Sequence, residues 1–273
     1  MIKMIGLDMD GTLLNDKKEL SEYTRSVLVR ALDQGIVVLP ATGRPLVGVP
    51  KAVREIPGIR YALTANGARV VDMDTGAIIY EKLLSVEDSV KVLDILREYD
   101  TLREVFREGR GYIEESALAS LEKYLFSEHA KRYVLETRAP IDDLEAYVKK
   151  IGEPLDKVHG IFSDYKERTE AFRRLRELKG IAATSALSNN IEVSHSAVNK
   201  GNGLVELGRA LGIKQEEIMG CGDGMNDVEM IREAGLGIAM ANGVAAVKEC
   251  ADYITGTNNE DGVAKAIEKF VLN

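Results

Sequence analysis

The most constraining feature of the sequence is a short apolar stretch that ends in two closely spaced aspartates. Met4, Ile5 and Leu7 form an apolar run without helical period, which is typical of a buried parallel strand. Asp8 and Asp10 follow directly, and the next two residues are glycine and threonine. Two carboxylates this close repel each other unless a cation lies between them or one is protonated. The pattern therefore indicates a divalent metal site, an acid/base pair, or both.

A purely structural interpretation of this pair is also open: one aspartate would cap a helix and the other would belong to a turn. The functional interpretation is favoured because the pair closes a strand of the buried type. Open parallel sheets bind ligands at the carboxyl ends of their strands. We therefore expect Asp8 and Asp10 to lie in a binding crevice.

Length and composition limit the class of protein. The chain has 273 residues, the length of two domains, and its content of 45% hydrophobic and 29% charged residues is typical of a globular protein. A net charge of −8 argues against nucleic acid or a membrane as a partner, although it allows an anionic small molecule in a locally positive pocket. The two cysteines have neither metal-ligand nor disulfide spacing, and the first residues resemble a core strand rather than a signal peptide. A cytoplasmic protein is expected, and its oligomeric state stays open.

Apolar strands alternate with helices in two separate parts of the chain, residues 1–84 and 187–273. This alternation predicts an α/β fold, a doubly wound parallel-sheet core of the Rossmann-like type. The core strands are expected at 4–7, 36–39, 61–64, 191–193, 218–221, 237–240 and 253–255. Residues 85–186 have a different pattern of helices and strands, which predicts an inserted α+β domain. Its helices are expected near 116–126, 140–151 and 166–178.

Polar residues follow several of the expected core strands or begin the helices after them. Thr42 and Gly43 follow the second strand, Lys200 begins a helix, and Asp223 and Asp227 follow a later strand. Such ends converge on one crevice. The set suits phosphoryl transfer, which needs a nucleophile, an acid/base, a cation and hydrogen-bond donors. Aspartates provide oxygen ligands for Mg²⁺, Thr42 and nearby amides can bind phosphate, and Lys200 offsets negative charge.

Four segments in order, 8–14, 41–44, 199–201 and 222–227, resemble the four motifs of the haloacid dehalogenase superfamily. The Thr-Gly-Arg form of the second motif and the long insert after it are similar to the Cof-like phosphatase branch. So is segment 64–68, which reads Thr-Ala-Asn-Gly-Ala. The resemblance covers the whole chain, and the four motifs together are far more specific than any one of them.

The resemblance implies a separate role for each aspartate. Asp8 would be the nucleophile and form an aspartyl-phosphate, and Asp10 would protonate the leaving oxygen and later activate water. Mg²⁺ would be held by the Asp8 carboxylate, the main-chain carbonyl of Asp10 and Asp223. Asp227 would bind the ion directly or stand behind the residues that do.

The resemblance also implies a set of residues that bind the substrate or its phosphate: Gly11, Thr42, Gly43, Arg44, Asn66, Lys200 and Asn226. Within this set Thr42 and Lys200 would bind the phosphoryl group, and the two glycines would contribute main-chain amides. Asn226 would position its neighbours, and Arg44 and Asn66 would line the mouth of the site. The inserted domain would be a cap that closes over the substrate and excludes water.

The sequence thus predicts a Mg²⁺-dependent phosphatase, a phosphoric monoester hydrolase, acting on sugar phosphates or a phosphorylated cofactor. A phosphosugar mutase and a catalytically silent sensor of a phosphorylated metabolite would use similar motifs. A phospho-acceptor receiver domain also combines an acidic pocket with threonine and lysine, but it is about half as long and has its acceptor on a later strand. His195 departs from the family pattern, and either substrate contact or plain exposure would account for it.

Overall fold

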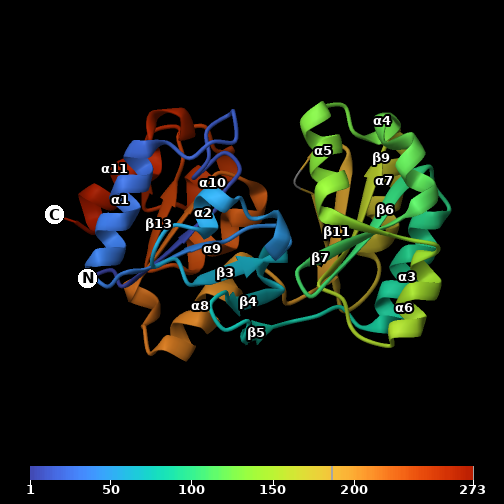
Figure 1. Cartoon of the computed structure of the whole chain (residues 1–273), viewed down its shortest axis with the longest axis horizontal. Helices are drawn as coiled ribbons and strands as arrows, with labels where there is room; N and C mark the ends of the chain where they lie inside the picture. The colour runs from blue at the N-terminus through green and yellow to red at the C-terminus, as the bar shows by residue number, and fades with distance from the viewer. Residues whose placement is uncertain (186, 273) are drawn as a thin grey trace. The chain divides into compact units, whose positions relative to one another are not determined.

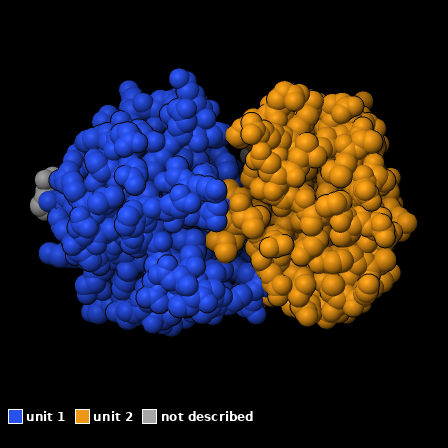
Figure 2. Space-filling model, viewed as in Figure 1, with its two compact units in different colours: residues 1–44, 49–81, 199–273 blue, residues 45–48, 82–198 orange. Residues whose placement is uncertain are grey.

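The computed structural model describes residues 1–185 and 187–272, which form two compact units (Figure 2). Unit 1 contains the described residues of 1–44, 49–81 and 199–273, and unit 2, here called the cap, contains those of 45–48 and 82–198. Within the described residues, the helices are all too short or too polar to cross a membrane.

Unit 1 is built on a five-stranded parallel sheet in the order β14-β13-β12-β1-β2. Its strands are β1 (Met4–Leu7), β2 (Val37–Pro40), β12 (Ile218–Gly222), β13 (Leu236–Ala239) and β14 (Tyr253–Ile254). An antiparallel sheet of β3 (Tyr61–Thr64), β4 (Arg69–Asp72) and β5 (Ile78–Glu81) continues from it through a parallel bridge between Ala41 and Leu63.

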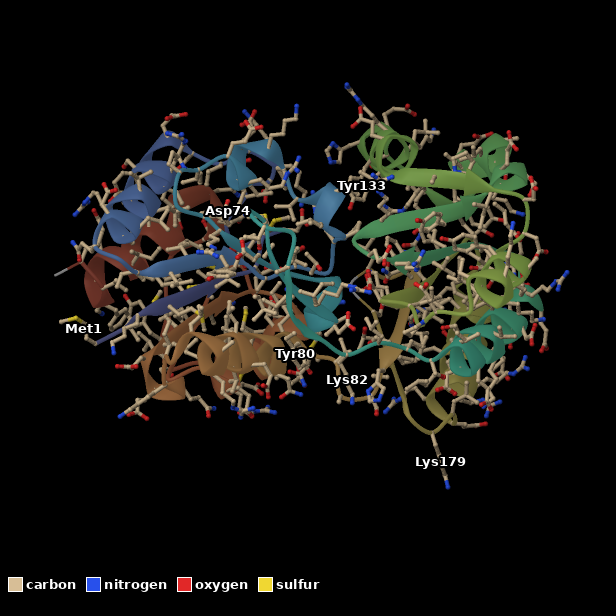
Figure 3. The ribbon with its side chains drawn as sticks, turned by 60° about the horizontal axis from the view of Figure 1, so that its bottom comes forward. Met1, Asp74, Tyr80, Lys82, Tyr133 and Lys179 are labelled. Atoms are coloured by element: carbon tan, nitrogen blue, oxygen red, sulfur yellow. The ribbon has the colours of Figure 1, made fainter. Side chains whose placement is uncertain are left out.

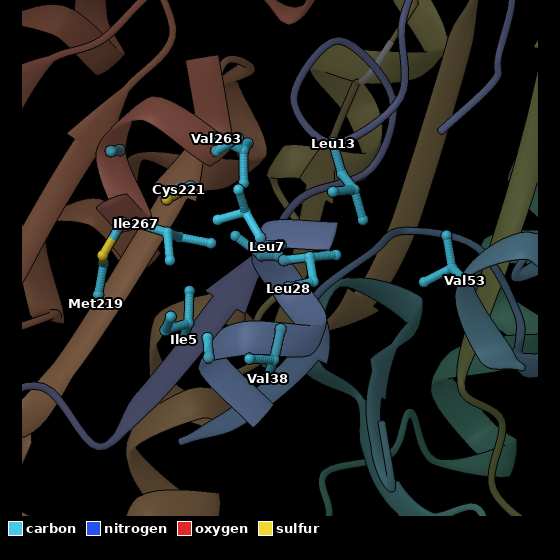
Figure 4. Packing of buried hydrophobic residues seen from close by; sticks show 14 of the residues in the cluster. Ile5, Leu7, Leu13, Leu28, Val38, Val53, Met219, Cys221, Val263 and Ile267 are labelled. Carbon is cyan, nitrogen blue, oxygen red and sulfur yellow. The ribbon is translucent and has the colours of Figure 1, made fainter. Parts of the chain in front are cut away.

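Helices cover both faces of the parallel sheet, which confirms the predicted doubly wound core. On one face α1 (Glu22–Asp33) and α11 (Gly262–Phe270) lie side by side (Figure 1). Ile5 and Leu7 of β1 pack there in a core of aliphatic side chains (Figure 4). On the other face Met4 packs with residues of α8 (Lys200–Leu211) and α9 (Val228–Glu233). The remaining α-helices of unit 1 are α2 (Lys51–Arg54) and α10 (Ala245–Cys250).

The cap contains a six-stranded mixed sheet in the order β10-β11-β9-β6-β7-β8, in which only the β7–β8 pair is parallel. Its strands are β6 (Thr101–Arg107), β7 (Arg110–Glu114), β8 (Arg138–Ile141), β9 (Lys157–Phe162), β10 (Ile181–Thr184) and β11 (Asn190–His195). The helices α3 (Val86–Arg97), α6 (Leu144–Ile151) and α7 (Tyr165–Arg176) pack on one face. The helices α4 (Leu121–Tyr124) and α5 (Glu128–Thr137) pack on the other (Figure 1).

The structure corrects one strand assignment at the end of the insert. Residues 191–193 were expected in the core sheet, but they belong to β11, which pairs with β9 and β10 in the cap. Ile191 and Val193 pack in the cap core, while the alternating Asn190, Glu192 and Ser194 are buried polar residues on the other face. The expected domain boundary at 186 falls on a residue outside those described.

The structure also corrects one helix assignment and shows one helix that the sequence interpretation did not include. Pro140 was expected to open a helix but lies in β8, and α6 begins after Asp143, whose carboxylate accepts a hydrogen bond from the Ala146 amide at 2.6 Å. Helix α5 had no counterpart in the sequence interpretation. Val134 is its only buried residue, so little of this helix packs into the cap core.

Candidate active site

The parallel strands β1, β2 and β12 end at the same edge of the sheet, and the first site residues follow these ends. Leu7, the last residue of β1, pairs in register with Pro40 of β2 and with Cys221 of β12. Asp8, Thr42 and Asp223 follow these strand ends and therefore emerge at the same edge. The parallel pairing that buries the strands also brings together residues that are far apart in sequence.

Lys200 provides a positive charge at this edge of the sheet. It begins α8, whose first turn is capped by Asn199. Its Nζ donates hydrogen bonds to Asp8 Oδ1 at 2.5 Å and to Asp227 Oδ1 at 2.6 Å. The side chain is fully buried, whereas a lysine normally projects into solvent as Lys179 does (Figure 3). Burial alone would lower the pKa of Lys200, but Asp227 and Asp8 outweigh burial and raise it, so this side chain is a permanent positive charge.

Asp8, Asp223 and Asp227, here called the acidic cluster, can each offer one carboxylate oxygen, and these oxygens all lie within 4.8 Å of one another. Burial raises the pKa of Asp8, and the charge of Asp227 raises it further against the opposing effect of Lys200. Burial also raises the pKa of Asp223, although a hydrogen bond from Thr12 Oγ1 at 2.8 Å opposes this rise. When ionised, three carboxylates and one ammonium leave two excess negative charges. Hard oxygen ligands with this charge fit a divalent cation such as Mg²⁺.

Asp227 orders the loop that carries Asp223. One of its carboxylate oxygens, Oδ2, accepts hydrogen bonds from the amides of Asp223 at 3.0 Å and Gly224 at 2.9 Å. The other oxygen faces Lys200. Asp227 is fully buried and accepts from three donors. It therefore joins residues 222–227, here called the acidic loop, to Lys200, which in turn contacts Asp8.

Asp10 has surroundings of the opposite kind. Its carboxylate accepts from Arg44 Nε at 2.9 Å and Arg44 Nη2 at 2.7 Å, and Lys18 Nζ lies 3.0 Å from Oδ1. Burial raises the pKa of Asp10, but the hydrogen bonds and charges of Arg44 and Lys18 outweigh burial and lower it. The two aspartates of one motif therefore have pKa values shifted in opposite directions. Such separation allows one of a carboxylate pair to take a different role from the other.

Two glycines let backbone and side chains approach closely. Gly11 has a φ of +91°, and a Cβ there would lie 2.4 Å from Asp223 Oδ2, so a side chain would displace that carboxylate. A Cβ on Gly43 would lie 2.9 Å from Asn66 Oδ1. Asn66 itself has a left-handed φ of 59°, and its Oδ1 accepts from Asn226 Nδ2 at 3.0 Å. This hydrogen bond ties the loop after β3 to the acidic loop.

Thr42 is the buried centre of the second motif. Its Oγ1 accepts from the Arg44 amide at 3.1 Å, and its carbonyl accepts from the Asn66 amide at 2.9 Å. Unit 1 thus holds every residue that the sequence interpretation assigned to the site. Lys18 was missed because it lies in a polar turn with no periodicity or motif, and its position next to the first motif was the only available signal.

The cap has a buried charged network of its own, here called the cap ion cluster. Arg138 Nε donates to Glu104 Oε1 at 2.8 Å, His159 Nδ1 lies 2.8 Å from Glu104 Oε2, and Lys157 Nζ lies 3.0 Å from Glu192 Oε2. Burial raises the pKa of Glu104, but Arg138 and His159 outweigh burial and hold it at about 2. Each carboxylate in this cluster has a cation beside it.

His195 and several arginines of the cap have partners within the cap. His195 is the last residue of β11, and its Nδ1 accepts from the Ala197 amide at 3.0 Å. Among the cap arginines, Arg103 pairs with Glu114 and Glu145, Arg107 with Glu153, and Arg132 with Glu136. These three guanidinium groups already have carboxylate partners within the cap.

Comparisons with known proteins agree with this geometry. The model of the haloacid dehalogenase-like hydrolase family matches residues 5–267. YcsE of Bacillus subtilis, a 5-amino-6-(5-phospho-D-ribitylamino)uracil phosphatase, is 34% identical over 274 residues, which are 99% of this chain and 96% of the relative. Phosphatase YwpJ of the same organism is 31% identical over 287 residues, covering 99% of this chain and all of the relative.

A solved structure leads to the same family. The crystal structure of a haloacid dehalogenase-like hydrolase from Bacteroides thetaiotaomicron matches with a TM-score of 0.84 and 30% identity, covering 98% of this chain and 99% of the other. The match extends over both units. The chain therefore belongs to the haloacid dehalogenase-like hydrolases and is one of their phosphatases, a phosphoric monoester hydrolase acting on small phosphorylated metabolites.

Proposed function

We propose that this phosphatase removes the phosphoryl group from a phosphorylated sugar, a sugar alcohol or a phosphorylated cofactor, through an aspartyl-phosphate on Asp8. Asp10 donates a proton to the leaving oxygen and then takes one from the water that hydrolyses the aspartyl-phosphate. Lys200 and Thr42 bind the phosphoryl oxygens, with main-chain amides at Gly11 and Gly43.

The observation that carries this proposal is the contrast between the two aspartates of the first motif. Asp8 lies in the acidic cluster with Lys200 at 2.5 Å, while Asp10 is half-exposed and held by Arg44. A nucleophile needs a fixed position, and an acid/base needs access to the leaving group and to water. The fixed position of Asp8 and the greater exposure of Asp10 fit these two positional needs.

The acidic cluster supports Mg²⁺ as the metal. Asp8 and Asp223, with the main-chain carbonyl of Asp10, would hold the ion, and Asp227 would support them from behind through the acidic loop. When bound, the ion neutralises charge on the phosphoryl oxygens and on the carboxylates around it. Without a cation, burial of three carboxylates against one lysine is unfavourable, because an uncompensated buried charge costs several kcal/mol, about 3–5 in typical cases.

The relatives support a polyol phosphate as the substrate class. The name of the relative YcsE describes a phosphate on a ribityl chain, which is an open-chain sugar alcohol. We propose a substrate of this chemistry for the present chain, a phosphate ester on a primary carbon of a polyhydroxylated chain. The two unpaired cysteines suit a reducing compartment, and we propose a cytoplasmic location.

The test is phosphate release from a panel of esters, measured with Mg²⁺ and with a chelator. The panel contains ribose 5-phosphate, glucose 6-phosphate, 5-amino-6-(5-phospho-D-ribitylamino)uracil, FMN, pyridoxal phosphate and AMP. We expect metal-dependent release that is fastest with the polyol and sugar phosphates. Release that is unaffected by the chelator would contradict the metal assignment, and a preference for AMP would contradict the substrate class.

The panel also separates the two alternative functions. A phosphosugar mutase would move the phosphoryl group to another hydroxyl without releasing phosphate, which isotope-labelled sugar phosphate would reveal. A silent sensor would bind an ester without converting it. No described residue favours either alternative, because Asp8, Asp10, Lys200 and Asp223 are all present.

A further inference from the structure

Asp223, one of the three carboxylates of the acidic cluster, has a fixed main chain. Its amide donates to Asp227 Oδ2 at 3.0 Å, and its carbonyl accepts from the Val244 amide at 2.9 Å. Gly243, next to Val244, packs so closely that a Cβ there would lie 3.1 Å from the Asp223 Cα. The backbone of Asp223 is therefore held on both sides. The direction of its carboxylate depends on other contacts, because the torsion that turns an aspartate carboxylate is only weakly restrained by the side chain itself.

Thr12 supplies the contact that directs this carboxylate. Its Oγ1 donates a hydrogen bond to Asp223 Oδ1 at 2.8 Å, while a Cβ on the preceding Gly11 would lie 2.4 Å from Asp223 Oδ2. The hydrogen bond on one oxygen and the main chain beside the other restrict rotation of the carboxylate. Thr12 is itself held firmly, since its side chain is buried and the Gly11 carbonyl before it accepts from Asn242 Nδ2 at 2.7 Å. A β-branched side chain also has little freedom about its first torsion, so the hydroxyl is a fixed donor.

Burial of a hydroxyl does not by itself indicate a role at a metal site, because a buried hydroxyl needs a partner in any folded protein. Thr24 of α1 shows this: it is buried, and its Oγ1 donates to Asp261 Oδ1 at 2.9 Å. Thr12 differs in its acceptor, which lies 211 positions further along the chain and belongs to the acidic cluster. Carboxylates that bind a metal ion are commonly oriented by such a hydrogen bond, and loss of the partner typically lowers metal affinity by about 10–100-fold.

We propose that Thr12 is a positioning residue, whose hydroxyl holds the Asp223 carboxylate in the orientation from which that carboxylate binds Mg²⁺. The hydrogen bond uses one acceptor position of Oδ1 and leaves the other positions of the carboxylate for the ion. A carboxylate that is already oriented loses less freedom when the ion binds, so the affinity is higher. In this role Thr12 contacts neither the ion nor the substrate. The inference rests on the proposed function, in which Asp8 and Asp223 hold Mg²⁺.

The test is the dissociation constant for Mg²⁺ alone, measured from the rise in thermal midpoint across a Mg²⁺ titration without substrate. Thr12→Val keeps the shape of the side chain but lacks the hydroxyl, and we expect its dissociation constant to be at least about tenfold higher than that of the wild type. Thr12→Ala, which removes the hydroxyl without placing a methyl group against the carboxylate, should give a similar rise. Thr12→Ser keeps the donor and should bind Mg²⁺ nearly as tightly as the wild type. Each variant is compared with its own metal-free midpoint, which separates affinity from stability.

Thr24→Val is the matched control, because it removes the same hydroxyl from another buried pair of threonine and aspartate. It should lower the metal-free midpoint and leave the dissociation constant for Mg²⁺ unchanged. An unchanged constant in Thr12→Val, or an equal rise in Thr12→Ser or Thr24→Val, would overturn the inference and leave the metal assignment intact. A wild type whose midpoint does not respond to Mg²⁺, or an Asp223→Asn variant that responds as the wild type does, would overturn the metal assignment and the inference with it.

Discussion

The acidic cluster of unit 1 and the cap ion cluster are both largely buried but differ in charge balance. In the acidic cluster Asp8, Asp223 and Asp227 share a single lysine. In the cap ion cluster Glu104 and Glu192 are matched by Arg138 and Lys157. The acidic cluster has more carboxylates than cationic partners, whereas each carboxylate of the cap ion cluster has a basic side chain of its own beside it.

This difference distinguishes a site that binds a ligand from a charged network that stabilises the fold. A buried charge without a partner is unfavourable, so a folded chain tolerates a charge excess where a bound ion or substrate completes the balance. A network in which every carboxylate has a basic partner needs no further ion, and its hydrogen bonds fix the strands that carry it. The comparison predicts that substitutions in the acidic cluster change catalysis and metal binding, whereas substitutions in the cap ion cluster change stability.

The largest effect is expected for Asp8→Asn. The amide has nearly the same volume but cannot act as the nucleophile, so kcat should fall by at least about 10⁴-fold. The free energy of unfolding without metal should not fall, because the substitution removes a buried negative charge whose pKa is already raised by burial. Phosphate release and urea unfolding measure the two quantities. Retained activity would remove Asp8 from the mechanism, and a strongly destabilised variant would make the acidic cluster structural.

The next largest effect is expected for Glu104→Gln, which leaves Arg138 buried without a carboxylate. At pH 7 the free energy of unfolding should fall by roughly 3 kcal/mol. The pKa of Glu104 is lowered from its ordinary 4.5 to about 2, so its stabilising contribution is present above pH 4.5 and is lost as the pH falls toward 2. The variant and the wild type should therefore converge in urea unfolding experiments as the pH approaches 2. A deficit that is independent of pH would point to packing rather than charge.

Mg²⁺ should stabilise the wild type by about 2.7 kcal/mol at a concentration 100 times its dissociation constant. The shift in thermal midpoint with added Mg²⁺ measures this contribution. We expect Asp223→Asn to lose most of the shift and Glu104→Gln to keep it, because only the first substitution reduces the charge excess. An equal shift in both variants would place the metal outside the acidic cluster.

The smallest effect is expected at the surface of the cap, where Arg173 pairs with Glu170 and Glu177 on α7. Arg173→Gln should change the free energy of unfolding by less than about 0.5 kcal/mol, since exposed ion pairs on helices are weak and are screened by salt. The measurement is the same urea titration at low and high salt. A loss comparable to that of Glu104→Gln would show that burial is not what distinguishes the two networks.

The sequence located the parallel strands correctly where an apolar run is followed directly by polar site residues. The apolar runs before Asp8 and Asp223 located two parallel strands, and parallel strands place their carboxyl ends at one edge. Residues 191–193 were assigned wrongly because a short alternating strand fits the mixed cap sheet as well as the core sheet. Only long-range pairing distinguishes the two, and a single sequence does not contain it.

The contacts of individual charged side chains were the least predictable part of the site. Lys17 and Lys18 are adjacent lysines with the same local sequence context, but of the two, in the described part of the chain, it is Lys18 that forms an ion pair with Asp10. The choice depends on the left-handed backbone of Lys18 and on the anchoring of Asp16 by Asn258 and Asn259. These residues lie more than 200 positions further along the chain, beyond the reach of any local pattern.

The pairing of β1 with β12 has a consequence for the order in which the molecule folds. Met4 lies opposite Ile218, so a ribosome has made most of the chain before β1 can acquire this neighbour. The cap, which lies between them in sequence, has its own hydrophobic cores and can form first. It then acts as a short connector, because the elements that flank it in sequence, β5 and α8, contact each other in unit 1. We therefore expect the cap to acquire protection from hydrogen exchange during synthesis earlier than β1 does. The catalytic centre would then be the last part of the protein to exist, and a truncated nascent chain would be folded in part but chemically inert.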